Sequence, residues 1–162
     1  KLLHLDIKPG NVYLRNDGNP VLIDFGAARQ TLAADGLKLP PMFTPGFASP
    51  EHHMDRAKLG PWSDIYSVGA TMYACINASA PPSAEERLDK DRMTPARKLG
   101  AGRFSSELLD TIDWCMRLEH LERPQSGFAL QKTLLGEKEP EYRSAAPVLE
   151  QLKGMWTKLG RR

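Results

Sequence analysis

The chain has 162 residues, a length that suits one domain or part of one. Apolar residues make up 41% and charged residues 26%, so the composition favours a packed core and excludes global disorder. The formal net charge is only +2, with both signs mixed along the chain, which indicates neither nucleic acid nor an anionic membrane as the main partner. No apolar run approaches the roughly 18–20 residues of a membrane span, and no signal peptide opens the chain.

Two further features bear on where the protein works. Cys75 and Cys115 both fall on apolar faces of predicted helices, so we expect buried free thiols rather than a disulfide or a metal site. A reducing, cytoplasmic setting fits this expectation. The first residue is Lys rather than Met, which indicates that the chain begins inside a longer protein.

The first pattern along the chain is polar. Residues 4–11 read His-Leu-Asp-Ile-Lys-Pro-Gly-Asn, and residues 24–26 read Asp-Phe-Gly. Together they offer two carboxylates, an amide and an ammonium. Phosphoryl transfer needs such a set: a carboxylate that orients a hydroxyl, a cation near the moving phosphate, and oxygen ligands for magnesium.

A β-hairpin is predicted between these two stretches. Residues 12–14 and 21–23 are short apolar runs, and residues 16–20 between them are dense in turn formers, including Asp-Gly. The hairpin would place Asn11 and Asp24 at adjacent strand ends. Both side chains could then face one ion.

The middle of the chain predicts a loop and then a helix. Residues 26–41 carry few large apolar side chains and end in a proline pair, which is typical of a mobile surface loop. Residues 44–51 read Thr-Pro-Gly-Phe-Ala-Ser-Pro-Glu. Ser63 then suits a helix N-cap. A helix of three to four turns is predicted after it, with an apolar stripe of Ile65, Val68, Met72 and Ile76.

Three more helices are predicted downstream. Ser83 followed by early acids starts a short helix, and Ser126 starts one that runs to about residue 135. Residues 92–102, which follow the first of these two helices, are predicted to form a loop. Ser105 or Ser106 then caps a helix whose apolar stripe is Leu108, Ile112, Cys115 and Met116.

The end of the chain is less clearly patterned. Residues 136–144 are charged and predict a linker. After Pro147, an amphipathic helix with a basic end is predicted, with a stripe of Val148, Leu152, Met155 and Leu159. Such a helix could pack on the preceding domain or begin a connector, and its few cations leave a membrane-surface role as the weaker alternative.

These motifs carry a family resemblance. Residues 4–11 and the Asp-Phe-Gly at 24–26 resemble the catalytic loop and the metal-binding motif of protein kinases. Residues 44–51 resemble the family's substrate-docking segment, which ends in Ala-Pro-Glu, with Ser49 in place of the Ala. Glu122-Arg123-Pro124 resembles the family's late Arg motif. The sequence of residues 62–82 resembles that of bacterial serine/threonine kinases of the eukaryotic-like type.

The resemblance implies a fold and a division of the chain. The implied fold class is α+β: the C-terminal lobe of a protein kinase, mainly helical, with a small β-hairpin that carries the catalytic loop and the Asp-Phe-Gly. Residues 1–135 would be this lobe of the catalytic domain, and residues 136–162 a linker and an amphipathic helix of unknown role. The N-terminal lobe would lie outside this chain.

The resemblance also implies the site residues, the cofactors and the partners. Asp6 would orient a Ser or Thr hydroxyl of a protein substrate and accept its proton, and Lys8 would lie against the γ-phosphate of ATP. Asn11 and Asp24 would hold Mg²⁺ or Mn²⁺. Thr44 would steady Asp6 and Lys8 and favour hydroxyl acceptors.

Structural roles are expected for Asp64, for His4 and for the pair of Arg123 and Glu51, and no metal site is expected at His52-His53. Asp64 would accept backbone N–H groups of the catalytic loop, although a first-turn acid favoured by the helix dipole would look the same in the sequence. Arg123 would pair with Glu51, where the alternative is a surface Arg before a turn. His4 is expected to be a packed structural histidine rather than a base. His52-His53 has no plausible third metal ligand nearby.

The chain departs from the family at two further points. Leu5 stands where the family usually carries the Arg that reads phosphate on the activation loop, so phosphorylation at Thr31, the best acceptor there, should matter little. No Gly-rich loop, strand Lys or partner helix Glu precedes Lys1, and those parts hold the nucleotide. The chain is therefore expected to be a kinase fragment that is inactive alone and binds Mg-ATP weakly or not at all.

Three alternatives remain open from the sequence. A pseudokinase or scaffold would keep these motifs without transfer. A small-molecule phosphotransferase of related fold would lack the docking segment and the late Arg. A partner-binding module would use the predicted tail helix to dock another protein.

Overall fold

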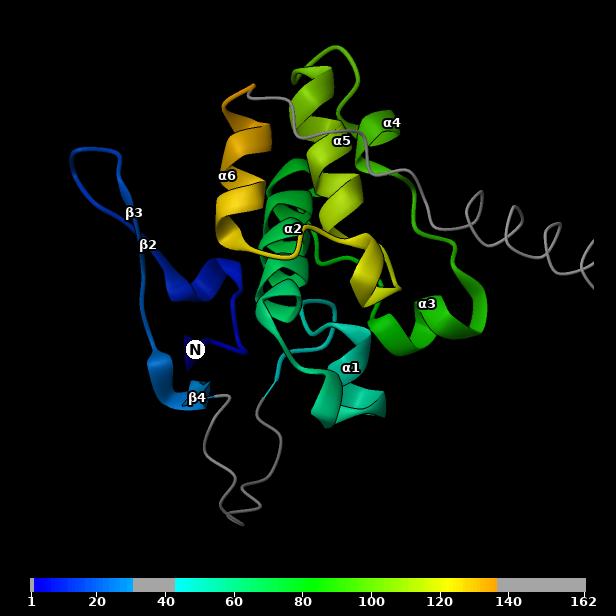
Figure 1. The fold of residues 1–162 in the computed structure, drawn as a ribbon. Helices are drawn as coiled ribbons and strands as arrows, with labels where there is room; N and C mark the ends of the chain where they lie inside the picture. Colours follow the sequence, from blue (N-terminus) through cyan, green and yellow to red (C-terminus); the bar gives the residue numbers. More distant parts are fainter. Residues whose placement is uncertain (1, 31–42, 137–162) are drawn as a thin grey trace, which may run out of the picture.

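The computed structural model describes residues 2–30 and 43–136. The expectations for the loop at 31–42, including Thr31, and for the linker and tail helix at 137–162 lie outside these residues. Within the described part the chain is mainly helical, with two antiparallel strand pairs at its N-terminal end (Figure 1).

The N-terminal residues form the predicted hairpin and one further strand pair. Strand β2 (Val12–Leu14) pairs with β3 (Pro20–Leu22), one residue earlier than expected, and Val12 lies opposite Leu22. Strand β1 (Leu2–Leu3) pairs with β4 (Arg29–Gln30). The expectation of a loop from residue 26 onward is therefore wrong for residues 29–30. These residues form a strand because β1, near the start of the chain, pairs with them. Short 3₁₀ turns η1 (Pro9–Asn11) and η2 (Phe25–Ala27) flank the hairpin.

The helices surround a long central one. Figure 1 shows α2 in the middle of the helical part, with α5 and α6 beside it and α1 and α3 toward one end. The helices are α1 (Pro50–Met54), α2 (Pro61–Asn77), α3 (Ala84–Lys90), α4 (Ala96–Leu99), α5 (Ser106–Cys115) and α6 (Gly127–Leu134), with 3₁₀ turns η3 (Arg56–Lys58) and η4 (His120–Glu122).

Helix α2 begins earlier than the sequence predicted. Its N-cap is Gly60 and its first residue is Pro61, a residue type suited to that position because its φ is already helical. The predicted cap, Ser63, is the third helical residue, where its Oγ accepts a hydrogen bond from the Gly60 N–H at 3.2 Å. The assignment of Ser63 as N-cap is thus wrong, and the helix has 17 residues rather than three to four turns.

The other predicted caps are confirmed, but one helix was missed. The hydroxyls of Ser83, Ser105 and Ser126 accept N–H bonds from the first turns of α3, α5 and α6. The region 92–102, expected as loop, contains α4. The carboxylate of Asp113 on α5 accepts the backbone N–H groups of Ala96 and Arg97, so this short helix is capped by a distant residue that no local pattern reveals.

The core lies between α2 and α5. Tyr66 and Ala70 of α2 are fully buried together with Ile112 and Met116. The helices approach closely at Gly69, where an added Cβ would lie 2.6 Å from the Cβ of Cys115, so this contact requires a glycine.

The two cysteines differ in environment. Cys115 is buried, as expected, and burial raises the pKa of its thiol to about 12. Cys75 is exposed, so its predicted burial is wrong. Tyr73 faces the core, and position 75 lies about 200° further round the helix, which turns the Cys75 side chain toward solvent. None of the helices in the described ranges has the length and apolar character that crossing a membrane requires.

Candidate active site

Three predicted site residues form a closed ring of hydrogen bonds. The Lys8 ammonium donates to Asp6 Oδ2 at 2.8 Å and to Thr44 Oγ1 at 2.8 Å, and the Thr44 hydroxyl donates to Asp6 Oδ1 at 2.9 Å. Asp6 and Lys8 come from the segment between β1 and η1, and Thr44 comes from the segment before α1. The ring fixes the Asp6 carboxylate in one orientation and holds a cation beside it.

Asn11 belongs to the same cluster. Its amide Nδ2 donates to the backbone carbonyl of Asp6 at 2.8 Å and to Asp6 Oδ2 at 3.3 Å. Because both partners are acceptors, the amide nitrogen must face Asp6 and the Asn11 Oδ1 must point away from it. Asn11 lies at the end of η1, where its own N–H is bound by the Lys8 carbonyl.

Asp24 lies beside Asn11 at the other end of the hairpin. The N–H of Ile23 donates to the Asn11 carbonyl at 2.9 Å, which brings the two strand ends together as predicted. Asp24 has a left-handed backbone (φ 62°), and its Oδ1 accepts the Gly26 N–H at 3.1 Å. Within the described residues it makes no hydrogen bond or ion pair with the other four predicted site residues.

The oxygens of Asn11 and Asp24 are of the kind that hold a hard divalent cation. Within the described residues, Asn11 Oδ1 accepts no hydrogen bond, and Asp24 uses only one of its two carboxylate oxygens. Carboxylate and amide oxygens are preferred ligands of Mg²⁺ and also suit Mn²⁺. The chemistry of this pair fits the predicted metal.

A carboxylate on α2 holds the segment that carries Asp6. Asp64 Oδ2 accepts the His4 N–H at 2.9 Å and Oδ1 accepts the Leu5 N–H at 2.8 Å. Leu5 is buried and has a positive φ of 66°, which is unfavourable for a residue with a branched side chain. The expected anchoring by Asp64 is confirmed, and its two bonds stabilise a backbone that would otherwise relax.

His4 packs where the sequence predicted. It is buried, its Nε2 is 3.1 Å from the Ile23 carbonyl oxygen, and its ring lies edge-on to Phe25 with centroids 4.8 Å apart. The histidine therefore ties the start of the predicted catalytic segment, residues 4–11, to the residue that follows β3. This is the structural role expected for it.

The predicted pair of Glu51 and Arg123 is present and buried. Arg123 Nη1 donates to Glu51 Oε1 at 2.8 Å and Nη2 donates to Oε2 at 3.1 Å, a two-pronged contact. Ser63 Oγ also donates to Glu51 at 2.8 Å. Burial alone would raise the pKa of the Glu51 carboxyl, but the bonds and charge of Arg123 outweigh it and hold that pKa below its ordinary value.

One contact in the docking segment escaped the sequence analysis. Ser49 Oγ lies 2.8 Å from His52 Nδ1, and both residues are buried. The Ser that stands in place of the family's Ala thus has a polar partner three residues on. No pattern in the sequence marks His52 as buried, so the pairing could have been found only by placing Ser49 at the N-cap of α1 and His52 in its first turn.

Comparison with known proteins identifies the family. A protein kinase domain model matches residues 1–135, and the chain belongs to that family. It is similar to Serine/threonine-protein kinase C of Synechocystis, 33% identical over an alignment of 145 residues that covers 84% of this chain and 26% of that protein. It is 33% identical over 140 residues to human Nek2, covering 84% of this chain and 31% of that protein.

Solved structures agree with this assignment. The structure described as the apo form of PpkA-294 matches with a TM-score of 0.68 and 33% identity, over 82% of this chain and 46% of that one. The protein-kinase-like fold expected from the sequence is therefore confirmed. The chain spans about a quarter to a third of the length of the two curated relatives, and about half of the solved chain.

Proposed function

We propose that this chain supplies the catalytic-loop part of an enzyme that transfers the γ-phosphoryl group of ATP to Ser or Thr hydroxyls of proteins, with residues 1–135 as its C-terminal lobe. The observation that carries the proposal is the ring formed by Asp6, Lys8 and Thr44, with Asn11 bound to the same carboxylate. Membership in the protein kinase domain family supports the same reaction.

The residues of the ring have distinct roles in this proposal. Asp6 orients the acceptor hydroxyl and takes its proton late in transfer, and the bonds from Lys8, Thr44 and Asn11 hold its carboxylate in place beforehand. The Lys8 ammonium offsets charge that develops on the transferred group. Thr44 links the docking segment to both, so substrate and base would be positioned together.

Asn11 and Asp24 would hold Mg²⁺ or Mn²⁺ through their free oxygens. Such an ion would neutralise part of the negative charge of the ATP phosphates. The protein's own contribution is to keep the two oxygens available: the Asn11 amide is locked by Asp6, and the Gly26 N–H orients the Asp24 carboxylate.

We further propose that residues 1–162 alone bind Mg-ATP weakly and transfer no phosphate. In protein kinases a Gly-rich loop and a strand lysine hold the nucleotide phosphates, and none of the described strands β1 to β4 carries a lysine. A thermal shift titration of the chain with Mg-ATP should show no stabilisation in the micromolar range. Micromolar binding would contradict this part of the proposal.

The test of the reaction uses the full-length protein. Asp6→Asn and Asp24→Ala should each reduce phosphotransfer from radiolabelled ATP by about a hundredfold or more while the melting temperature stays close to that of the natural protein. Asp89→Asn, which changes an exposed carboxylate on α3, is the matched control and should leave the rate unchanged. Retained turnover in Asp6→Asn would remove the assignment, and ATP binding without transfer in the natural protein would indicate a pseudokinase.

Phosphorylation of Thr31 should not control this activity. Leu5 is apolar and buried, so the catalytic segment offers no guanidinium at that position to bind a phosphate. Thr31→Ala in the full-length protein should retain most of the natural rate. A hundredfold loss of rate would show that another cationic side chain binds the phosphate at Thr31.

A further inference from the structure

The ring of Phe43 lies against two neighbouring histidines of α1. Its centroid is 4.4 Å from that of His53, with 69° between the ring planes, and 6.2 Å from that of His52, with 65°. Edge-to-face contacts between aromatic rings at about these separations are attractive beyond the area that they bury. Phe43 directly precedes Thr44, whose hydroxyl closes the hydrogen-bonded ring at the proposed active site. The aromatic cluster of Phe43, His52 and His53 therefore lies one residue from that ring.

Each of the two imidazoles is held by a polar partner at Nδ1. His52 Nδ1 lies 2.8 Å from the buried hydroxyl of Ser49, and His53 Nδ1 lies 3.1 Å from Oε1 of Glu85 on α3. Ser49 is the N-cap of α1, yet its hydroxyl accepts no N–H from the first turn of that helix. The Ser49 hydroxyl therefore fixes a side chain instead of capping the helix, as a serine in that position usually does.

The second nitrogen of both imidazoles is buried. Within the described residues, neither Nε2 atom has a hydrogen-bond partner. Such atoms are unfavourable and require an explanation, because an aliphatic side chain in the same place would avoid them. A histidine, however, combines a polar atom that a partner can hold with an aromatic surface that another ring can contact. The contact with Phe43 is what the two histidines share.

The chain that follows Thr44 is fixed to α2. The Thr44 carbonyl accepts the N–H groups of Phe47 at 3.1 Å and of Ala48 at 3.2 Å, which closes a turn. The Phe47 carbonyl accepts the hydroxyl of Ser67 on α2 at 2.7 Å. Thr44 is thus anchored on its C-terminal side through backbone groups.

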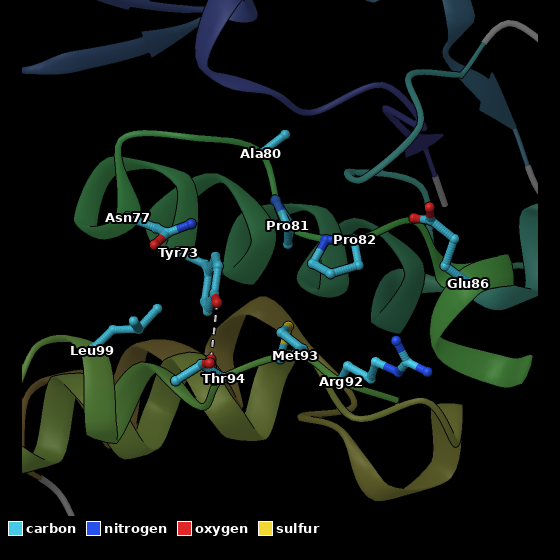
Figure 2. A pocket seen from close by; sticks show the side chains of 10 residues that line it. All are labelled: Tyr73, Asn77, Ala80, Pro81, Pro82, Glu86, Arg92, Met93, Thr94 and Leu99. Atoms are coloured by element: carbon cyan, nitrogen blue, oxygen red, sulfur yellow. Dashed lines mark hydrogen bonds between the residues drawn. The ribbon is translucent and has the colours of Figure 1, made fainter. Parts of the chain in front are cut away.

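The link between α2 and α3 supports the same turn. Gly46 has a φ of +86°, and a Cβ added there would lie 2.8 Å from the Pro81 carbonyl oxygen, so the two backbones touch. Figure 2 shows Pro81 in this link. On the N-terminal side of Thr44, Phe43 is the first residue that the structure describes after the gap at 31–42, and its ring contacts are with α1.

From this arrangement we propose that Phe43 is a positioning residue: held by the two histidines, it sets the place of Thr44 and, through it, of the Asp6 carboxylate. This inference rests on the proposed function, in which Asp6 is the base. Without the ring of Phe43, Thr44 would be anchored on one side only, and its hydroxyl would bond Asp6 for less of the time. The rate of transfer should then fall, while the affinity for the nucleotide should not change.

The first experiment measures the anchoring itself and does not depend on catalysis. In the full-length protein, Phe43→Ala should accelerate amide hydrogen exchange at Phe47 and Ala48 by about tenfold, because the Thr44 carbonyl that accepts them is held less firmly. Exchange in α5 should not change. Phe104→Ala, which removes a ring from the link between α4 and α5, is the matched control and should leave both amides unaffected. Unchanged exchange in Phe43→Ala would overturn the inference.

A second pair of variants tests the role of the histidines. His53→Ala removes the nearer of the two rings and should accelerate exchange at the same two amides. Added to Phe43→Ala, it should have no further effect, because both changes remove the same contact. Effects that add in the double variant would show that His53 acts apart from Phe43, and the aromatic cluster would not be the anchor.

The second experiment asks whether the anchoring reaches the reaction. Phe43→Ala and Thr44→Val should each lower kcat of the full-length protein by about tenfold, with KM for Mg-ATP changed by less than about twofold. The double variant should be no slower than Thr44→Val, since Phe43 acts through the Thr44 hydroxyl. Losses that multiply would show a general effect on stability and would overturn the inference. Phe43→Leu, which keeps apolar bulk without the ring, allows the same comparison if the alanine variant folds poorly.

The two experiments separate this inference from the proposed function. Faster exchange in Phe43→Ala, together with no transfer by the natural protein, would remove the proposed reaction and keep Phe43 as the anchor of Thr44. Transfer by the natural protein, with the exchange and kcat of Phe43→Ala unchanged, would keep the reaction and remove the anchor.

Discussion

The proposed catalytic segment, residues 4–11, and the helical base of the chain, α2 and α5, are held by different forces. In the base, α2 and α5 join through fully buried apolar side chains such as Tyr66 and Ile112. Around the proposed catalytic segment and around the docking segment (residues 44–51), distant parts of the chain join through carboxylates. Asp64 accepts the backbone N–H groups of His4 and Leu5, and Glu51 accepts hydrogen bonds from Arg123. Apolar burial supplies stability in proportion to area, whereas a buried carboxylate with fixed partners specifies one backbone geometry. Each prediction below separates these two contributions.

Removing the guanidinium partner of Glu51 should have the largest effect. Arg123→Ala leaves a carboxylate buried without its counter-charge, and breaking such a pair costs about 3–5 kcal/mol of unfolding free energy. Urea denaturation measures it. The matched control is Arg117→Ala, because Arg117 is 49% exposed and pairs with Glu122 at the surface, where the loss should be below about 1 kcal/mol. Equal losses in the two variants would mean that burial of the pair has no special role.

A cavity in the base should cost slightly less. Ile112 is fully buried between α2 and α5, and Ile112→Ala should lower the free energy of unfolding by about 3 kcal/mol without changing the geometry around Asp6. Val21→Ala on the hairpin, where the side chain is 38% exposed, should cost less than about 1 kcal/mol. If the hairpin variant were the more damaging one, the base would not be the main source of stability.

The Asp64 anchor should show a smaller loss of stability with a local signature. Asp64→Asn replaces one of two acceptor oxygens with an NH₂ group, so either the His4 or the Leu5 N–H loses its partner. The free energy of unfolding should fall by about 1–3 kcal/mol. Amide hydrogen exchange at these two residues should accelerate, while exchange in α5 changes only with global stability. Uniform acceleration throughout the chain would show that Asp64 acts on the whole fold instead.

The smallest effect is expected from the buried imidazole of the docking segment. Burial lowers the pKa of His52 below its ordinary value of 6.5, and the opposing attraction of Glu51 and Asp64 does not offset this, while His53 adds to it. The unfolded chain therefore takes up a proton near pH 6.5 that the folded chain excludes. The corresponding stability is present above pH 6.5 and is lost as the pH falls through the lower, folded pKa.

Comparison of two variants isolates this titration. The drop in unfolding free energy between pH 7.5 and pH 5.5 should be smaller in His52→Gln than in the natural chain, since the remaining histidines are common to both. Glu51 does not interfere, because its pKa is lowered from 4.5 and its contribution is lost only at more acid pH. Identical pH profiles would show that His52 is not held neutral.

The sequence predicted what local chemistry decides. Serine caps at 83, 105 and 126 followed from the residues next to them, and Asn11 and Asp24 were placed together by one hairpin turn. Ser63 failed as a cap because Pro61 starts the helix sooner. Helix α4 was missed because its cap is Asp113, 17 residues away from Ala96.

For the site, the limit of prediction lay at contacts between segments. Asp6 and Lys8 are two residues apart, so their proximity follows from the sequence alone. The approach of Thr44, 38 residues from Asp6, came only with the family resemblance. The bond between Ser49 and His52 was absent from both sources, because it depends on burial that neither residue type implies.

The spacing of Glu51 and Arg123 also orders the events of folding. The two residues are 72 positions apart, and the helices α2 to α5 lie between them. Closing a loop of that length has an entropic cost that early local contacts do not repay, so the pair should form only after α2 and α5 have docked. We therefore expect the segment around Glu51 to become ordered last during refolding, after the helical base has assembled. Under mild denaturant the same segment should open first, while the helical base remains folded.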